Sequence, residues 1–238
     1  MKKTILFLIS LITLIGCNES TTPDNTGKNY RMVKWWGYFY ENGSYGNKIL
    51  AKVEHYSNNL IVQCDLYNMF GDIVGAETYE YDDDNYLTKI SVVYEDNLYD
   101  DYYITYTYEG SRLIYKTRFN DKNKKWEESE YIYNEQNKII TELYTAYWGI
   151  MKEDSIIYFY DTSGNLIKKE FWDAGEEPFE INEFIYNSKN QLIEFILKTN
   201  MGDVVKEVNS YNSSGLLIEK IHYQDGEITG KFVYEYIY

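Results

Sequence analysis

The chain has 238 residues, of which 18% are aromatic and only 2 are proline, a composition that allows a large, strand-rich core. Its net charge of −15 excludes DNA, RNA and anionic bilayer surfaces as electrostatic partners. Binding to these surfaces depends on basic side chains that neutralise phosphates.

Residues 1–16 have the pattern of a lipoprotein signal peptide. Two lysines precede an apolar run, from residue 5 to residue 15, that is too short for a comfortable membrane span. The following "LIGC" ends at Cys17 and resembles the bacterial lipobox, whose cysteine is diacylated and becomes the mature N-terminus. The resemblance implies lipidation at Cys17 and the lipid bilayer as a partner. An ordinary secretory leader or an N-terminal anchor helix is the alternative.

Residues 17–29 are expected to form the lipidated cysteine and a flexible tether, because residues 18–29 contain no large apolar side chain. Asn18 is not the aspartate associated with inner-membrane retention, so the resemblance to lipoproteins implies the outer membrane of a diderm cell. The periplasmic and surface sides both stay open. Lipidation of Cys17 leaves Cys64 without an intramolecular disulfide partner.

Residues 30–52 differ from the rest of the chain and are expected to form an N-terminal cap. A terminal repeat lacks one neighbour and needs its edge covered. The segment carries Trp35 and Trp36, so a ligand site is the alternative.

From residue 53 to residue 238 one phrase recurs, as in "YDTSGNLIKKEFW" at residues 160–172. It combines a tyrosine, a polar turn and an apolar strand start. Alignment on the first tyrosine gives a period of 25 to 27 residues, which indicates a repeat architecture. We call these eight residues the repeat tyrosines: Tyr56, Tyr81, Tyr108, Tyr133, Tyr160, Tyr186, Tyr211 and Tyr236.

Each unit contains a second turn signal near its middle, so it is expected to form a β-hairpin of two strands. Fifteen strands follow from eight repeat tyrosines and the seven strands between them. Apolar residues do not recur at helical spacing outside the leader. We therefore predict an all-β fold, an antiparallel β-hairpin repeat array that forms a large curled or twisted meander sheet with the repeat tyrosines inward. An open sheet, a spiral and a sandwich all remain possible.

The units "YDTSGNL", "YNSSGLL" and "YDDDNYL" resemble the YD repeats of Rhs and teneurin proteins. The resemblance covers residues 53–238 and implies a β-shell, which in bacterial relatives can enclose a toxin. This chain lacks the proline-containing motif and the toxin region expected at the C-terminus of those relatives. The resemblance therefore favours the architecture over toxin delivery, and leaves open an accessory or immunity partner of a Rhs-type system.

The sequence presents no catalytic constellation. His55 and His222 are expected to be ordinary sheet residues, and Cys64 a buried inert thiol. Acidic clusters lack the spacing of a calcium loop, so solvated turns are expected: Asp82, Asp83, Asp84, Asp96, Asp100 and Asp101. We predict no metal, no cofactor and no enzymatic activity.

Aromatic residues outside the repeat register are the candidate ligand contacts: Trp126, Trp148 and Trp172. Trp and Tyr stack on sugars and are enriched in protein interfaces. The leading hypothesis is a membrane-anchored envelope lipoprotein whose repeat body binds a protein or glycan, or serves a structural role. The alternative from another class is a polysaccharide-directed hydrolase with paired carboxylates.

Overall fold

The computed structural model describes residues 32–41, 44–95, 99–147 and 152–237, and every regular element within these ranges is a β-strand. The strands follow one another in an antiparallel meander. Their bounds are β1 (Met32–Glu41), β2 (Ser44–Tyr45), β3 (Ile49–Ser57), β4 (Leu60–Tyr67), β5 (Ile73–Tyr81), β6 (Leu87–Tyr94), β7 (Tyr102–Glu109), β8 (Arg112–Asn120), β9 (Lys125–Tyr133), β10 (Ile139–Ala146), β11 (Lys152–Tyr160), β12 (Leu166–Trp172), β13 (Glu180–Tyr186), β14 (Leu192–Thr199), β15 (Val204–Tyr211), β16 (Leu217–Gln224) and β17 (Glu227–Ile237). The predicted all-β hairpin array is confirmed, and β3 to β17 are the fifteen strands that the repeat predicts.

The turns after the repeat tyrosines share a side-chain bond that explains their sequence. Asp161, next to Tyr160, accepts hydrogen bonds from the backbone N–H groups of Ser163 (2.9 Å) and Asn165 (2.8 Å). Gly164 has a φ of +85°, a left-handed conformation that glycine and asparagine tolerate. The same pattern of bonds occurs in the turns 82–86, 134–138, 161–165, 187–191 and 212–216.

The hydroxyl groups of the repeat tyrosines explain why tyrosine recurs instead of phenylalanine. Tyr160 donates a hydrogen bond of 2.9 Å to the carbonyl oxygen of Ile139, the residue that pairs with the preceding repeat tyrosine, Tyr133. That carbonyl lies beyond the end of the β10–β11 ladder, whose outermost pair is Thr141 with Ile157. The Tyr160 hydroxyl therefore ties its unit to the preceding one. Tyr81, Tyr108, Tyr133, Tyr211 and Tyr236 donate in the same way.

A β-bulge also recurs in each hairpin that follows a repeat tyrosine. Tyr160 pairs with Leu166 and Phe159 pairs with Lys168, so Ile167 is the extra residue on β12. Bulges bend a strand and increase its twist. Their repetition at one end of every unit curves the sheet in a constant direction.

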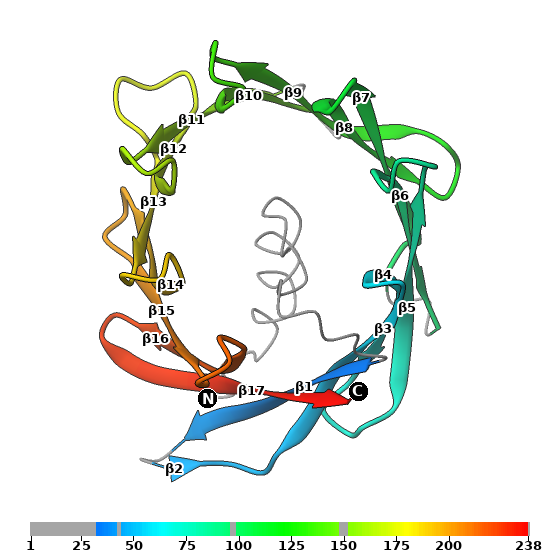
Figure 1. Cartoon of the computed structure of the whole chain (residues 1–238), viewed down its shortest axis with the longest axis vertical. Coiled ribbons are helices and arrows are strands. Elements are labelled where there is room, and N and C mark those ends of the chain that lie inside the picture. The colour runs from blue at the N-terminus through cyan, green and yellow to red at the C-terminus, as the bar shows by residue number, and fades with distance from the viewer. Residues whose placement is uncertain (1–31, 42–43, 96–98, 148–151, 238) are drawn as a thin grey trace.

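The curvature ends in closure, because β1 pairs with both ends of the array. It runs antiparallel to β17, from Met32 opposite Ile237 to Phe39 opposite Gly230, and it also pairs with β3. Figure 1 shows the resulting ring of strands. The predicted curl of the sheet is confirmed and goes as far as closure, which the sequence left undecided: the sheet is a closed barrel. Residues 30–52 were expected to form a cap, and within their described part β1 is the strand that closes the barrel. It satisfies backbone groups that two free edges would leave unpaired.

The two faces of the barrel differ in burial. Register places Tyr79 opposite Ile90, and Glu77 opposite Val92, on the same face. This face holds nearly all of the buried side chains, among them a core cluster of Ile90, Val92 and Tyr106. Because side chains converge on the concave face of a barrel, the buried face is the inner one. The expected inward orientation of the repeat tyrosines agrees with this assignment.

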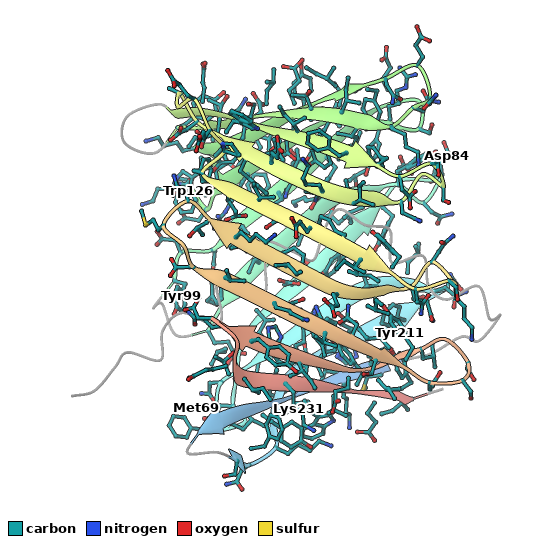
Figure 2. All side chains as sticks on the ribbon, turned by 90° about the vertical axis from the view of Figure 1, so that its left-hand side faces the viewer. Met69, Asp84, Tyr99, Trp126, Tyr211 and Lys231 are labelled. Atoms are coloured by element: carbon teal, nitrogen blue, oxygen red, sulfur yellow. The ribbon has the colours of Figure 1, made fainter. Side chains whose placement is uncertain are left out.

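Hairpin connectivity places the turns at two opposite ends of the barrel. We call the end with the repeat-tyrosine turns the repeat rim, and the other end the tip rim. Figure 2 shows Asp84 at the repeat rim, and Met69, Tyr99 and Trp126 toward the tip rim. Met32 pairs with Ile237, so the described chain enters and leaves at the repeat rim.

Candidate functional site

The structure describes two of the three tryptophans that the sequence singles out. Trp126 on β9 is half-buried, with the guanidinium of Arg118 5.3 Å from its ring. Trp172, at the end of β12, is also half-buried, and its Nε1 has no hydrogen-bond partner among the described residues. Trp148 lies outside the described residues. Neither of the two described side chains is fully exposed, and their role as ligand contacts stays a prediction.

Cys64 and His55, which the sequence predicts to be an inert thiol and an ordinary sheet residue, lie on adjacent strands. Cys64 on β4 is a fully buried free thiol, and burial raises its pKa, which disfavours the reactive thiolate. His55 on β3 places Nε2 2.7 Å from Oδ2 of Asp65. The environment of Cys64 is that of a core thiol.

The acidic turn residues stabilise backbone conformation. Oδ1 of Asp82 accepts hydrogen bonds from the backbone N–H groups of Asp84 (3.0 Å) and Tyr86 (2.8 Å). Asp101 accepts one from the N–H of Tyr94 (2.9 Å), and Asp96 lies outside the described residues. Within the described ranges, no group of three His, Cys, Asp or Glu residues is placed to hold a metal ion.

Carboxylates on the inner face are bound by tyrosine hydroxyl groups. Tyr158 donates to Oε2 of Glu142 at 2.5 Å, and Tyr79 donates to Oε2 of Glu77 at the same distance. Hydrogen bonds to charged acceptors are stronger than neutral ones, so these contacts offset the cost of burying the carboxylates. The inner face is thus an aromatic layer with satisfied charges inside it.

Large apolar side chains are exposed at the tip rim. Phe70 is 81% exposed, although it lies in a turn that is ordered by Asn68. We define the tip patch as Met69, Phe70, Ile73 and Tyr99, which are all exposed and come from the β4–β5 and β6–β7 connections. Acidic side chains lie on the same two connections: Asp72, Glu95, Asp100 and Asp101. The combination is an apolar patch within an acidic surround.

A second group lies on the inner face where β1 and β17 close the barrel. Nζ of Lys52 lies 2.8 Å from Oε1 of Glu54 and 3.6 Å from the centroid of the Trp35 ring. The Trp35 ring meets that of Tyr234 edge to face, at a centroid distance of 4.7 Å. These contacts link β3, β1 and β17 across the seam.

The same group continues onto β15 and β16. Glu207 is buried, with its carboxylate 2.8 Å from Nζ of Lys220 and 3.3 Å from Nδ1 of His222. Burial, and next the charge of Glu207, raises the pKa of Tyr234, so its hydroxyl stays protonated. Burial lowers the pKa of His222, so the imidazole is neutral at pH 7.

Four polar atoms of this group are buried without a hydrogen-bond partner among the described residues: Nε1 of Trp35, Oδ1 of Asn209, Nε2 of His222 and the hydroxyl oxygen of Tyr234. A buried polar atom without a partner costs about 1–3 kcal/mol. We call these four residues and the two ion pairs Lys52–Glu54 and Lys220–Glu207 the seam cluster.

Neither the tip patch nor most of the seam cluster was predicted from the sequence. The signal for the tip patch was present, since the turn "NMFGD" at residues 68–72 contains large apolar residues where polar ones suffice. The seam cluster combines residues almost 200 positions apart, and only closure brings Trp35 beside Tyr234.

Comparisons with known proteins show no family. No family model matches the chain, and no curated protein does. Solved structures similar to it include TcdB2-TccC3-TEV (12% identity, TM-score 0.34), where the match covers 84% of this chain and 14% of that one. A porin-like protein from Bacteroides uniformis ATCC 8492 has 9% identity and a TM-score of 0.40 over 87% of this chain and 96% of that one. The chain therefore spans about one seventh of the length of the toxin-complex chain.

Proposed function

We propose that this chain is a non-catalytic, lipid-anchored envelope module that binds a protein partner through its tip rim. The observation that carries the proposal is the position of the tip patch, at the end of the barrel opposite to the one where the described chain enters. A lipid on Cys17 would hold the repeat rim toward the membrane. The tip patch would then face away from the membrane.

The length of the tether fits this arrangement. A flexible coil of about 15 residues, as expected for the tether, would have a root-mean-square span of roughly 20 Å. That distance keeps the repeat rim near the bilayer and leaves the tip rim free to meet a partner.

The outer face of the barrel carries ion pairs beside exposed apolar side chains such as Val93, Leu143 and Ile185. Lys–Glu ion pairs occur there at mid-strand positions, as in Lys198–Glu183 (2.8 Å), Lys206–Glu194 (3.0 Å) and Lys231–Glu219 (3.0 Å). Lipid-facing strands carry an apolar band at this height. The ion pairs therefore favour attachment through one lipidated residue over insertion of the strands. No helix in the described ranges is long and apolar enough to cross a membrane.

The chemistry of the tip patch indicates the kind of partner. Exposed methionine and aromatic side chains are typical of protein interfaces, and an exposed apolar cluster needs a functional explanation. The acidic residues beside it attract positive charge. We expect a protein with an apolar pocket bordered by lysine or arginine.

Site-specific photo-crosslinking tests the rim assignment. A photoreactive phenylalanine analogue at position 70 in living cells should give a discrete protein adduct, whereas the same analogue at Lys189, an exposed residue in a repeat-rim turn, should not. Phe70→Ser should weaken the partner's co-purification with the protein. Adducts of equal yield from both positions, or none from position 70, would contradict the proposal.

The lipid anchor has its own test. Cys17→Ala should abolish incorporation of labelled palmitate and release the protein from the membrane fraction. Cys64→Ala is the matched control, because this buried thiol is not available for acylation. Membrane association that survives Cys17→Ala would refute lipid anchoring without bearing on the tip patch.

A further inference from the structure

A second turn at the tip rim also exposes a large apolar side chain. Met201, in the β14–β15 connection, is 88% exposed, compared with 81% for Phe70 in the tip patch. Its turn has the sequence "NMGD" at residues 200–203, close to the "NMFGD" at residues 68–72. Polar residues suit solvated turns, so the fold itself gives no reason for methionine in either one. Methionine adapts to the shape of a partner, and its presence in both turns indicates a common use.

The backbone of the two turns is ordered in the same way. In the first turn, Gly71 donates its N–H to the carbonyl oxygen of Asn68 (3.1 Å). In the second, Gly202 donates its N–H to the carbonyl oxygen of Thr199 (3.0 Å). Both glycines have a left-handed backbone, with φ of +86° and +93°. Met201 is therefore presented by an ordered turn, which loses little conformational entropy when it binds.

The two turns lie far apart on the ring. Among the described strands β2 pairs only with β1, so the ring itself has sixteen. A barrel of sixteen strands, spaced about 4.8 Å apart and tilted by about 40°, has a backbone diameter of roughly 30 Å. Figure 1 shows β4 and β5 on one side of the ring and β14 and β15 on the other. The tip patch and Met201 are therefore separated by roughly 30 Å across the tip rim.

This separation restricts the kind of partner that can touch both turns. An extended peptide of fewer than about nine residues is too short, at about 3.4 Å per residue. A folded domain of about 100 residues has a radius of gyration of about 13 Å, so it is roughly 30 Å across. One folded protein can therefore contact the tip patch and Met201 together. Two contacts made by one molecule give a higher affinity than either contact alone.

The charge of the tip rim favours a basic partner. The described connections at the tip rim carry ten acidic and three basic side chains, whereas those at the repeat rim carry five and two. An aspartate follows the glycine in both apolar turns, at Asp72 and Asp203. Such a surface attracts a positively charged protein and speeds its association. It repels an acidic one, including a second copy of this chain, whose net charge is −15.

We propose that the partner at the tip rim is one folded, basic protein that spans the rim and contacts both the tip patch and Met201. Its apolar contacts lie at these two places, and its basic side chains face the acidic connections. The inference rests on the proposed function, because it assigns a second contact and a size to the same partner. It can fail separately, since a partner can bind the tip patch alone.

Photo-crosslinking from both turns tests whether one partner spans the rim. The photoreactive phenylalanine analogue is placed at position 201 of the full-length protein in living cells, and mass spectrometry identifies the captured protein. Position 201 should capture the same protein as position 70, and Lys189 at the repeat rim should capture none. With the analogue at positions 70 and 201 of one chain, the adducts should hold one partner per barrel.

Affinity measured with the purified partner separates two contacts from one. Calorimetric titration of the full-length chain with the protein captured from position 70 should give a ratio of one to one. Met201→Ser should weaken binding roughly tenfold and leave the melting temperature unchanged, because this side chain is 88% exposed. Lys122→Ser is the matched control and should not weaken binding. Asn120 orders the turn of Lys122 with the same bonds that Asn68 provides in the tip patch turn.

Three results would overturn the inference while the proposed function stands. These are an adduct from position 70 without one from position 201, an affinity that Met201→Ser leaves unchanged, and adducts that hold two partners per barrel. Capture of an acidic protein would also overturn it, because the charge of the rim would repel that protein. The absence of an adduct from position 70 is a different result, since it refutes the proposed function and this inference with it.

Discussion

The two rims of the barrel are built by different rules. At the repeat rim, five turns share one set of hydrogen bonds, and tyrosine hydroxyls and bulges recur beside them. Two tip-rim turns, 68–72 and 120–124, have the same bonds, without the tyrosine hydroxyls. At the tip rim the connections differ in length, from the two-residue turn at Asp225 and Gly226 to the long connection 173–179. The repeat rim exposes polar turn residues, whereas the tip rim exposes Phe70 and Met201.

The difference shows which end of the unit maintains the architecture. Bulges and tyrosine hydroxyls at the repeat rim bend the sheet and join each unit to the preceding one. The tip rim repeats fewer of these features, although Asn68 and Asn120 order two of its turns. It is therefore free to vary and to carry binding residues.

Truncation of a repeat tyrosine should cause the largest loss of free energy of unfolding. Tyr160→Ala removes a half-buried ring and the hydrogen bond to Ile139, and should lower the free energy of unfolding by about 3 kcal/mol. Met201→Ala at the tip rim should change it by less than about 0.5 kcal/mol, because Met201 is 88% exposed. Urea denaturation measures both. Equal losses would remove the distinction between the rims, and a negligible loss for Tyr160→Ala would mean that the repeat tyrosines face solvent.

Substitution of a turn residue should also destabilise the protein more at the repeat rim than at the tip rim, with a smaller loss of free energy of unfolding than for a repeat tyrosine. Asn187→Ala removes the acceptor for the N–H groups of Lys189 (2.8 Å) and Gln191 (3.0 Å), and should cost about 1 kcal/mol. Asn200→Ala is the matched tip-rim control, since the exposed Asn200 side chain makes no hydrogen bond to the described residues. Thermal unfolding of the two variants compares them. A larger loss for Asn200→Ala would reverse the assignment of the structural rim.

The smallest expected effect is a pH dependence of the free energy of unfolding that arises from His222, near the seam that joins the first and last strands. Burial lowers the pKa of His222 in the folded state, so below about pH 6.5 the unfolded state binds a proton that the folded state rejects. The free energy of unfolding should therefore fall as pH decreases from about 7 to about 5. In His222→Gln this fall should be shallower, as measured by denaturation at each pH. An unchanged slope would show that His222 is not held neutral.

Much of the fold was predictable because its signals are local. The period of the tyrosines, the polar turns and the absence of helical spacing gave the fifteen strands β3 to β17. The buried thiol at Cys64 was also predictable, since it lies in an apolar strand. Closure was not predictable, because it depends on the summed curvature of many bulges, and a bulge has no unique sequence signature. The partial burial of Trp126 and Trp172 depends on side chains from neighbouring strands.

By itself, the sequence determined the strand order, the turn chemistry and the position of each repeat tyrosine, because these depend on residues a few positions apart. Only the tertiary structure decided that the sheet closes, that six of the repeat tyrosines donate to the preceding unit, and that Trp35 meets Tyr234. These contacts join residues from about 20 to 199 positions apart. Their geometry follows from accumulated twist and bending, which local sequence patterns do not specify.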